Sequence, residues 1–149
     1  MSKNTVEKYL DLLSKVFVVY RLGAYSRNLR KEVVKAGKWY FYDNGIRNAI
    51  INNFNPLAVR QDTGALWENY LISERIKMCN NKTQAKEFYF WRTYDNQEID
   101  LIEESSKRLS AFEFKWGDKK PSAPSAFTAT YLEASFEVIN KDNYLNFIL

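Results

Sequence analysis

The segment that most constrains the fold reads Leu109-Ser110-Ala111-Phe112-Glu113-Phe114-Lys115-Trp116. Successive side chains of a β-strand point to opposite faces of the sheet. On such a strand Phe112, Phe114 and Trp116 share one face, whereas Glu113 and Lys115 share the other. An acid and a lysine on the polar face of an otherwise aromatic strand indicate a functional site rather than ordinary surface.

The preceding strand-like segment, residues 98–103, is joined to this strand by a turn of hairpin length. Regular alternation places Glu98, Asp100 and Ile102 on one face and Ile99 and Leu101 on the other. If the hairpin pairs in register, Asp100 lies beside Glu113. Two carboxylates at that separation repel each other unless a cation or a proton lies between them. Their hard oxygen ligands suit Mg²⁺ or Mn²⁺, so the pattern predicts a metal site at Asp100 and Glu113.

A third carboxylate, Glu68, lies on a predicted helix over residues 65–79, one helical turn before Ile72. It therefore falls on the apolar stripe that should face the sheet. A buried carboxylate needs a partner, which a metal ion or a lysine would supply. The alternative is a structural salt bridge with Arg75 or Arg92.

The spacing of an acid, any residue and a lysine is a weak signal when taken alone. It occurs again at Asp118-Lys119-Lys120, within a lysine-rich loop before Pro121. Context separates the two, because only the first lies in an apolar strand that follows an acidic one.

The rest of the chain predicts an α/β (α+β) protein with a mixed β-sheet flanked by helices. A helix with apolar residues at helical spacing, a short strand, a basic loop and a second strand match the back half of a winged-helix unit. The front half of that unit is missing, so we expect a fragment of a longer protein. We predict a partial winged-helix segment at 1–52, a linker at 53–63 and a second domain at 64–149. Further strands are expected at 18–20, 38–42, 88–92 and 136–140, and further helices near 4–17 and 127–131.

Basic residues gather between Arg21 and Lys38, although the whole chain carries only 22 Lys and Arg against 18 Asp and Glu. Such a cluster can follow a nucleic-acid backbone, or it can be a solvated loop. The residues that we expect to contact nucleic acid, with DNA as the expected partner, form the basic arm: Arg27, Arg30, Lys31 and Lys35.

Composition excludes several classes of site. The 149 residues contain no histidine and one cysteine, so histidine-dependent triads, histidine-ligated metals and cysteine-built zinc sites are ruled out. No apolar run approaches the roughly 20 residues of a membrane span, and the N-terminus lacks the pattern of a signal peptide. We therefore expect a cytoplasmic protein without a membrane partner.

Five motifs in order give the chain a resemblance to a known family. The chain resembles the C-terminal domain of uncharacterised function in a bacterial and archaeal AAA-type ATPase family, whose members look like a winged-helix piece followed by a restriction-endonuclease-like core. The motifs are Lys38-Trp39-Tyr40-Phe41-Tyr42-Asp43-Asn44-Gly45, Gly64-Ala65-Leu66-Trp67-Glu68-Asn69-Tyr70, Tyr89-Phe90-Trp91-Arg92, Glu98-Ile99-Asp100-Leu101-Ile102 and Phe112-Glu113-Phe114-Lys115.

The resemblance implies an active site made of Glu68, Asp100, Glu113 and Lys115. Asp100 and Glu113, with the main-chain oxygen of Phe114, would hold Mg²⁺ or Mn²⁺ against a phosphodiester oxygen. Lys115 would orient or help to deprotonate the attacking water and would stabilise negative charge. Glu68 would bind the metal ion or its water shell.

The resemblance also implies a partner, the ATPase module, which this chain lacks. No GxxxxGK[ST] motif occurs, so ATP is expected to bind only through that separate N-terminal module. Two functions remain compatible with the sequence. One is metal-dependent cleavage of DNA by a nuclease-like domain. The other is a non-catalytic module that binds DNA or a partner for the ATPase, with the four charges forming a salt-bridge cluster.

Overall fold

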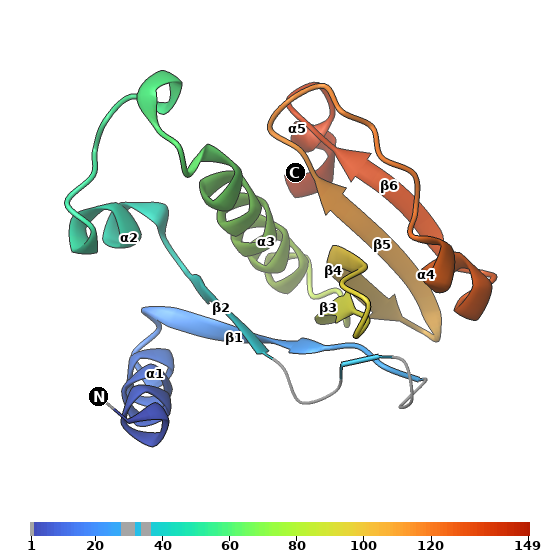
Figure 1. Ribbon diagram of the computed structural model, residues 1–149, viewed down its shortest axis with the longest axis horizontal. Coiled ribbons are helices and arrows are strands. Elements are labelled where there is room, and N and C mark those ends of the chain that lie inside the picture. Colours follow the sequence, from blue (N-terminus) through green and yellow to red (C-terminus); the bar gives the residue numbers. More distant parts are fainter. Residues whose placement is uncertain (1, 28–31, 34–36) are drawn as a thin grey trace.

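A computed structural model describes residues 2–27, 32–33 and 37–149. The chain forms a mixed sheet with helices against it, which confirms the predicted α/β (α+β) class (Figure 1). The elements are α1 (Lys3–Lys15), β1 (Val19–Ala24), β2 (Gly37–Phe41), α2 (Asn44–Ile50), the 3₁₀ turn η1 (Leu57–Val59), α3 (Thr63–Asn81), β3 (Glu87–Arg92), β4 (Glu98–Ser105), β5 (Arg108–Phe114), α4 (Ser125–Thr130), β6 (Ser135–Ile139) and α5 (Tyr144–Ile148).

The six strands lie in the order β2-β1-β3-β4-β5-β6. The pairs β1–β3 and β5–β6 are parallel, and the other pairs are antiparallel. The two strands of the predicted winged-helix segment therefore extend the same sheet that carries β4 and β5. The predicted division at residues 53–63, where η1 lies, stays a prediction.

The predicted hairpin forms between β4 and β5, with Leu101 opposite Phe112 and Ser105 opposite Arg108. Its tight turn places Ser106 and Lys107 at φ values of 49° and 67°. Two consecutive positive φ values are typical of the turn whose twist matches that of a β-hairpin. This turn fixes the register, and Leu101–Phe112 is the last pair of the ladder before Asp100 and Glu113.

The regular alternation expected for β4 is wrong at Asp100. Tyr89 of β3 pairs with Ile102, and Trp91 pairs with Ile99. One residue of β3 therefore lies opposite two residues of β4, Asp100 and Leu101. Such a bulge re-aims the side chains beside it. As a result Ile99 and Ile102 pack in the same core cluster, whereas Leu101 packs on the other side of the sheet.

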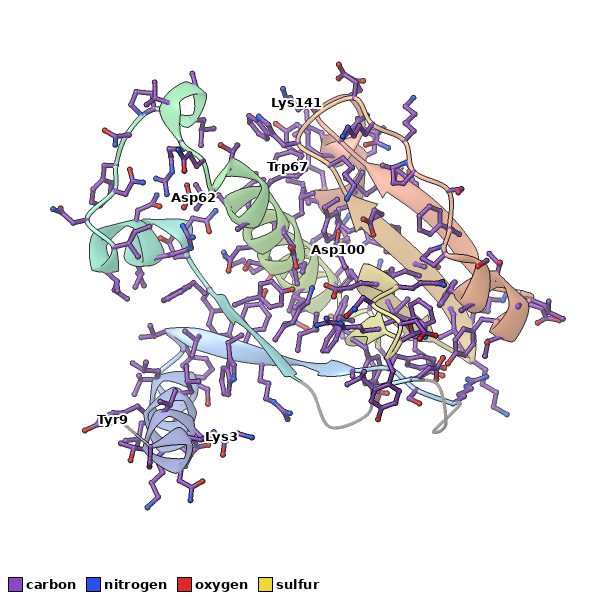
Figure 2. All side chains as sticks on the ribbon, in the orientation of Figure 1. Lys3, Tyr9, Asp62, Trp67, Asp100 and Lys141 are labelled. Atoms are coloured by element: carbon purple, nitrogen blue, oxygen red, sulfur yellow. The ribbon has the colours of Figure 1, made fainter. Side chains whose placement is uncertain are left out.

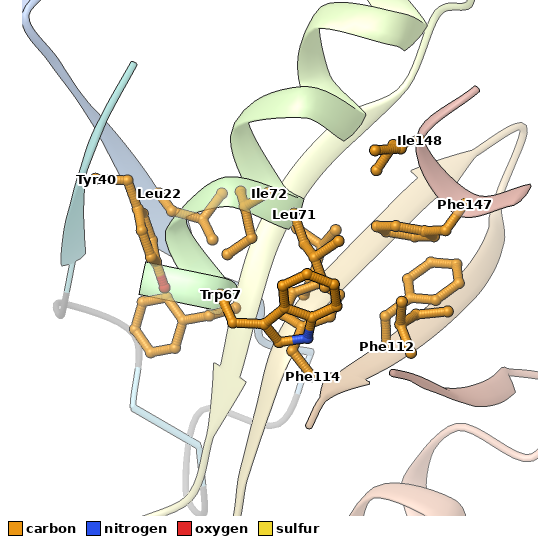
Figure 3. Packing of buried hydrophobic residues seen from close by; sticks show 12 residues of the cluster. Leu22, Tyr40, Trp67, Leu71, Ile72, Phe112, Phe114, Phe147 and Ile148 are labelled. Carbon is orange, nitrogen blue, oxygen red and sulfur yellow. The ribbon is translucent and has the colours of Figure 1, made fainter. Parts of the chain in front are cut away.

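Two hydrophobic clusters cover the two faces of the sheet. One joins α3 and α5 to the sheet through Leu71, Ile72, Phe112 and Phe147, and Figure 3 shows this packing. The other includes Trp91, Ile102 and the α4 residue Phe127. Burial of these large apolar side chains is the main force that holds the helices on the sheet.

The structure contains helices that the sequence patterns did not indicate, because they are too short to show a period. Helix α2 begins shortly after β2, and the Asp43 carboxylate caps it by accepting from the backbone N–H groups of Gly45 and Ile46. Helix α5 packs against α3 near the C-terminus. Within the described residues, no helix is long and apolar enough to cross a membrane.

Candidate functional site

Glu68 projects from α3 toward strand β2. Its Oε1 accepts hydrogen bonds from the Tyr40 hydroxyl (2.5 Å) and from the Lys38 ammonium (3.2 Å). Tyr40 is 6% exposed, and burial together with the charge of Glu68 raises the pKa of its hydroxyl. Glu68 is therefore a half-buried carboxylate with a lysine partner, and that partner is neither Arg75 nor Arg92.

Lys38 is a site residue that the sequence analysis missed. Its ammonium also forms an ion pair with Glu98 and lies 5.4 Å from the ring centroid of Phe90. Burial disfavours the charged ammonium, but the charges of Glu68, Glu98 and Asp100 outweigh that effect and raise the pKa of Lys38. The position of Lys38 at the end of a basic segment suggested solvent or phosphate contact. Only the alternation of β2, which places Lys38 on the same face of the strand as Tyr40, could have indicated a contact within the protein.

Asp100 lies among the acidic groups, and Figure 2 shows it near the centre of the molecule. Its Oδ2 accepts a hydrogen bond from the backbone N–H of Phe114 (2.9 Å), just past the last paired residues of the β4–β5 ladder. Burial, then the charges of Glu68 and Glu113, raise the pKa of Asp100 from 3.8 to about 7, against the lowering effects of that N–H group and of Lys38. The charges of Glu68, Glu113 and Lys38 thus all act on Asp100.

Glu113 and Lys115 form a close ion pair, with 2.6 Å between Glu113 Oε1 and Lys115 Nζ. Burial opposes the charge on Lys115, but the hydrogen bond with Glu113 and the charges of Glu113, Asp100 and Glu68 raise its pKa overall. Lys115 therefore stays protonated at neutral pH.

The structure brings the four predicted residues into electrostatic contact around Asp100. They approach it from different directions. Glu68 comes from α3, on the face where Phe112 and Phe114 meet α5, whereas strand alternation directs Glu113 and Lys115 to the opposite phase of β5. Asp100 interacts both with Glu68 and with Glu113. Its carboxylate accepts from the Phe114 N–H group just beyond the last pair of the β4–β5 ladder.

A metal ion would have to be held by few protein ligands. Among the described residues, no three Asp, Glu or Cys side chains are grouped as a ready metal site. Mg²⁺ commonly uses one or two carboxylates and completes its octahedral shell with waters and substrate phosphate oxygens. Asp100 and Glu113 carry the type of oxygen ligand that this donor set needs, and burial with the charges of Glu68 and Glu113 raises the pKa of Asp100.

The predicted basic arm falls largely outside the described part of the chain, which excludes Arg30, Lys31 and Lys35. Arg27 is described, and its guanidinium donates to Glu104 (3.0 Å). Its backbone N–H donates to Glu32 (3.0 Å) and to the Tyr131 hydroxyl (3.1 Å). The Arg27 side chain is 54% exposed, so it can reach a phosphate only by competing with Glu104.

Relatives of this chain are similar in sequence but carry no assigned function. Uncharacterized protein Rv2008c of Mycobacterium tuberculosis and Uncharacterized protein Mb2031c of Mycobacterium bovis are each 28% identical to it over 127 residues. That alignment covers 84% of this chain and 27% of each relative, so the chain spans about a quarter of the length of the relatives. No solved structure matches the chain.

Two family models match successive parts of the chain, and they meet near the predicted linker. Residues 1–57 match a domain of unknown function, DUF8612, which covers α1, β1, β2 and α2. Residues 63–146 match a second domain of unknown function, which covers α3 and the strands that carry Asp100 and Glu113. Since this second match spans more than half of the chain, the protein belongs to the DUF4143 family.

Proposed function

We propose that this chain is a nuclease-like domain that cleaves phosphodiester bonds with the help of Mg²⁺ or Mn²⁺ at Asp100 and Glu113, and that it works behind an AAA-type ATPase module. The observation that carries the proposal is the half-buried Asp100 carboxyl, whose pKa is raised to about 7 by burial and by the charges of two other acids, Glu68 and Glu113. A group in that state gains most from a cation that replaces its proton. An acid on α3, an acid on β4, and an acid near the end of β5 followed two residues later by a lysine support a restriction-endonuclease-like core.

The chain's own residues would act as follows. Asp100 and Glu113 would hold the ion, and a bound ion of this kind polarises a phosphodiester oxygen. Lys115 would stabilise the negative charge that develops on the phosphate, since its raised pKa keeps it a cation and makes it a poor proton acceptor. Tyr40 and Lys38 would orient Glu68 through its Oε1.

Lys38 specifically favours the second candidate function, a non-catalytic module that binds DNA or a partner. Its ammonium already forms ion pairs with both Glu68 and Glu98. In this interpretation the two lysines and the acids form a structural network that joins β2, α3, β4 and β5. Such a network needs no metal ion, and breaking it would cost stability rather than activity.

The test compares Asp100→Asn and Lys115→Ala with wild type by Mn²⁺ calorimetry, thermal melting and cleavage of DNA and RNA. We expect Asp100→Asn to lose both metal binding and cleavage. We expect Lys115→Ala to keep metal binding and to lose cleavage by about 100-fold, since oxyanion-stabilising groups contribute effects of that order.

The second acid-x-lysine motif gives matched controls, because Asp118 and Lys120 carry the same residue types on an exposed loop. Asp118→Asn and Lys120→Ala should behave like wild type in all three measurements. A wild-type protein that cleaves no substrate with Mn²⁺, together with a strongly destabilised Lys115→Ala, would refute the enzyme and leave the binding module.

A further inference from the structure

A cavity of about 490 Å³ opens beside the start of α3. Its lining comes from α2, α3, the segment after β5 and the region of α5, and it includes none of the charged residues described above. The volume lies within the range of pockets that bind small molecules. The cavity is therefore a second candidate site with its own chemistry.

Aromatic rings form the walls of this cavity. The Trp67 indole stacks on the Tyr70 ring, with 6.1 Å between centroids and 26° between planes. Trp116 and Tyr144 meet the same indole edge-on, at centroid distances of 5.2 and 5.1 Å. Flat walls of this kind suit a planar ring, and bases of any sequence stack on such side chains.

Three shielded polar atoms at this cavity have no hydrogen-bond partner among the described residues: Asn44 Oδ1, Asn48 Oδ1 and Trp67 Nε1. Trp67 is only 8% exposed. The orientation of the Asn44 amide is fixed, because its nitrogen donates to the Leu66 carbonyl (3.0 Å) and leaves the oxygen unpaired. Buried polar groups are almost always hydrogen-bonded, so one donor and two acceptors at one cavity point to a ligand that carries both kinds of group.

A cation completes the site at its rim. The exposed Lys141 ammonium lies 4.5 Å from the centroid of the Trp116 ring. A lysine in that position can bind a phosphate as a compact point charge. Stacking walls, unpaired polar atoms and a rim cation together match the parts of a nucleotide.

We propose that this cavity binds a nucleobase by stacking and edge hydrogen bonds, with Lys141 on its phosphate. The base belongs either to a free nucleotide or to an unpaired position of a nucleic-acid strand. The proposal goes beyond the metal-dependent site and does not rest on it. The two sites are adjacent all the same, because Trp67 precedes Glu68 and Trp116 follows Lys115, and consecutive Cα atoms are about 3.8 Å apart.

The test is calorimetry in EDTA with each of the four nucleoside monophosphates, the four nucleosides and a single-stranded octanucleotide of mixed sequence. Tyr70→Ala should weaken binding of the preferred monophosphate by roughly tenfold, within the range for loss of one stacking side chain. Lys141→Gln should reduce the affinity for the monophosphate to that for the nucleoside and leave nucleoside binding unchanged.

Matched controls are Tyr94→Ala and Lys119→Gln, which change exposed residues of the same types outside the cavity. Tyr70 is 36% exposed, so its replacement should leave the fold intact, which a circular dichroism melt checks. The measurements in EDTA leave no metal ion at Asp100 and Glu113, which separates this proposal from the metal-dependent one.

The measured affinities distinguish a base in a strand, a base in a free nucleotide and the absence of a binding site. An octanucleotide that binds more tightly than any monophosphate and loses affinity in Tyr70→Ala assigns the base to a strand. A monophosphate that binds while the octanucleotide does not compete assigns it to a free nucleotide. Absence of saturable binding by every probe at millimolar concentration, or equal losses in the control variants, would overturn the proposal.

Discussion

Replacing Asp100 with asparagine should stabilise the protein at alkaline pH. The native pKa of Asp100 is raised from 3.8 to about 7, a shift of roughly three units, and each unit corresponds to about 1.4 kcal/mol. Ionising this half-buried carboxyl therefore costs the native state about 4 kcal/mol above pH 7. Asparagine keeps an oxygen that can accept from the Phe114 N–H and carries no charge, so most of that cost should disappear.

The pH dependence has a definite sign. Below about pH 4 the carboxyl is protonated in both the native and the unfolded state and causes no difference between them. Between about pH 4 and 7 the unfolded chain releases a proton that the native state retains, so native stability falls as the pH rises. Above about pH 7 the loss is complete. Asp100→Asn lacks this loss, and its advantage over wild type should grow through the same interval.

Urea unfolding at pH 4.5 and pH 8 in EDTA measures the effect. We expect the free energy of unfolding of Asp100→Asn to exceed that of wild type by about 2 to 4 kcal/mol more at pH 8 than at pH 4.5. Asp118→Asn, on an exposed loop, should show no such change. A stability difference between Asp100→Asn and wild type that is the same at both pH values would show that Asp100 ionises normally and would refute the electrostatic argument for the site.

Three further predictions concern the ion pairs of Lys38, the hydrogen bond of the Tyr131 hydroxyl and the basic arm. Lys38→Met should lower the free energy of unfolding by about 2 kcal/mol in urea unfolding because it removes the ammonium that pairs with two half-buried carboxylates, Glu68 and Glu98. Lys15→Met, which breaks an exposed pair, should cost less than about 1 kcal/mol. Tyr131→Phe should lower the free energy of unfolding by about 2 kcal/mol because it removes the hydroxyl that donates to the buried Glu32 carboxylate. Tyr9→Phe, at an exposed ring, should leave the free energy of unfolding unchanged in the same assay. Alanine at all four positions of the basic arm should weaken duplex DNA binding and reduce the log–log salt slope by about 0.9 per lost phosphate contact in titrations at several salt concentrations, and an unchanged slope would make the arm a solvated loop.

The sequence by itself determined the strands and the main helix because these depend on neighbours along the chain. Alternation in residues 109–116 correctly separated Phe112 and Phe114, which pack against α5, from Glu113. The hairpin followed from the short distance between two strand-like segments, and its ladder ends at Leu101 and Phe112, the residues next to Asp100 and Glu113. The stripe on α3 placed Glu68 toward the sheet, where it meets Tyr40. These features rest on periods of two and of about 3.6 residues, which a sequence displays directly.

Tertiary structure alone decided how the charges and the cavity are completed. Lys38 meets Glu98 across sixty positions of sequence, although β1 and β3 lie between β2 and β4 in the sheet. The bulge at Asp100 arises from the pairing of β4 with β3, and the residues of β4 do not by themselves predict it. The aromatic cavity combines α2, α3 and α5, two of which are too short to show a period. Local patterns specify which face a side chain takes, but contacts between distant segments depend on how the sheet and helices pack, and that packing decided which groups the site contains.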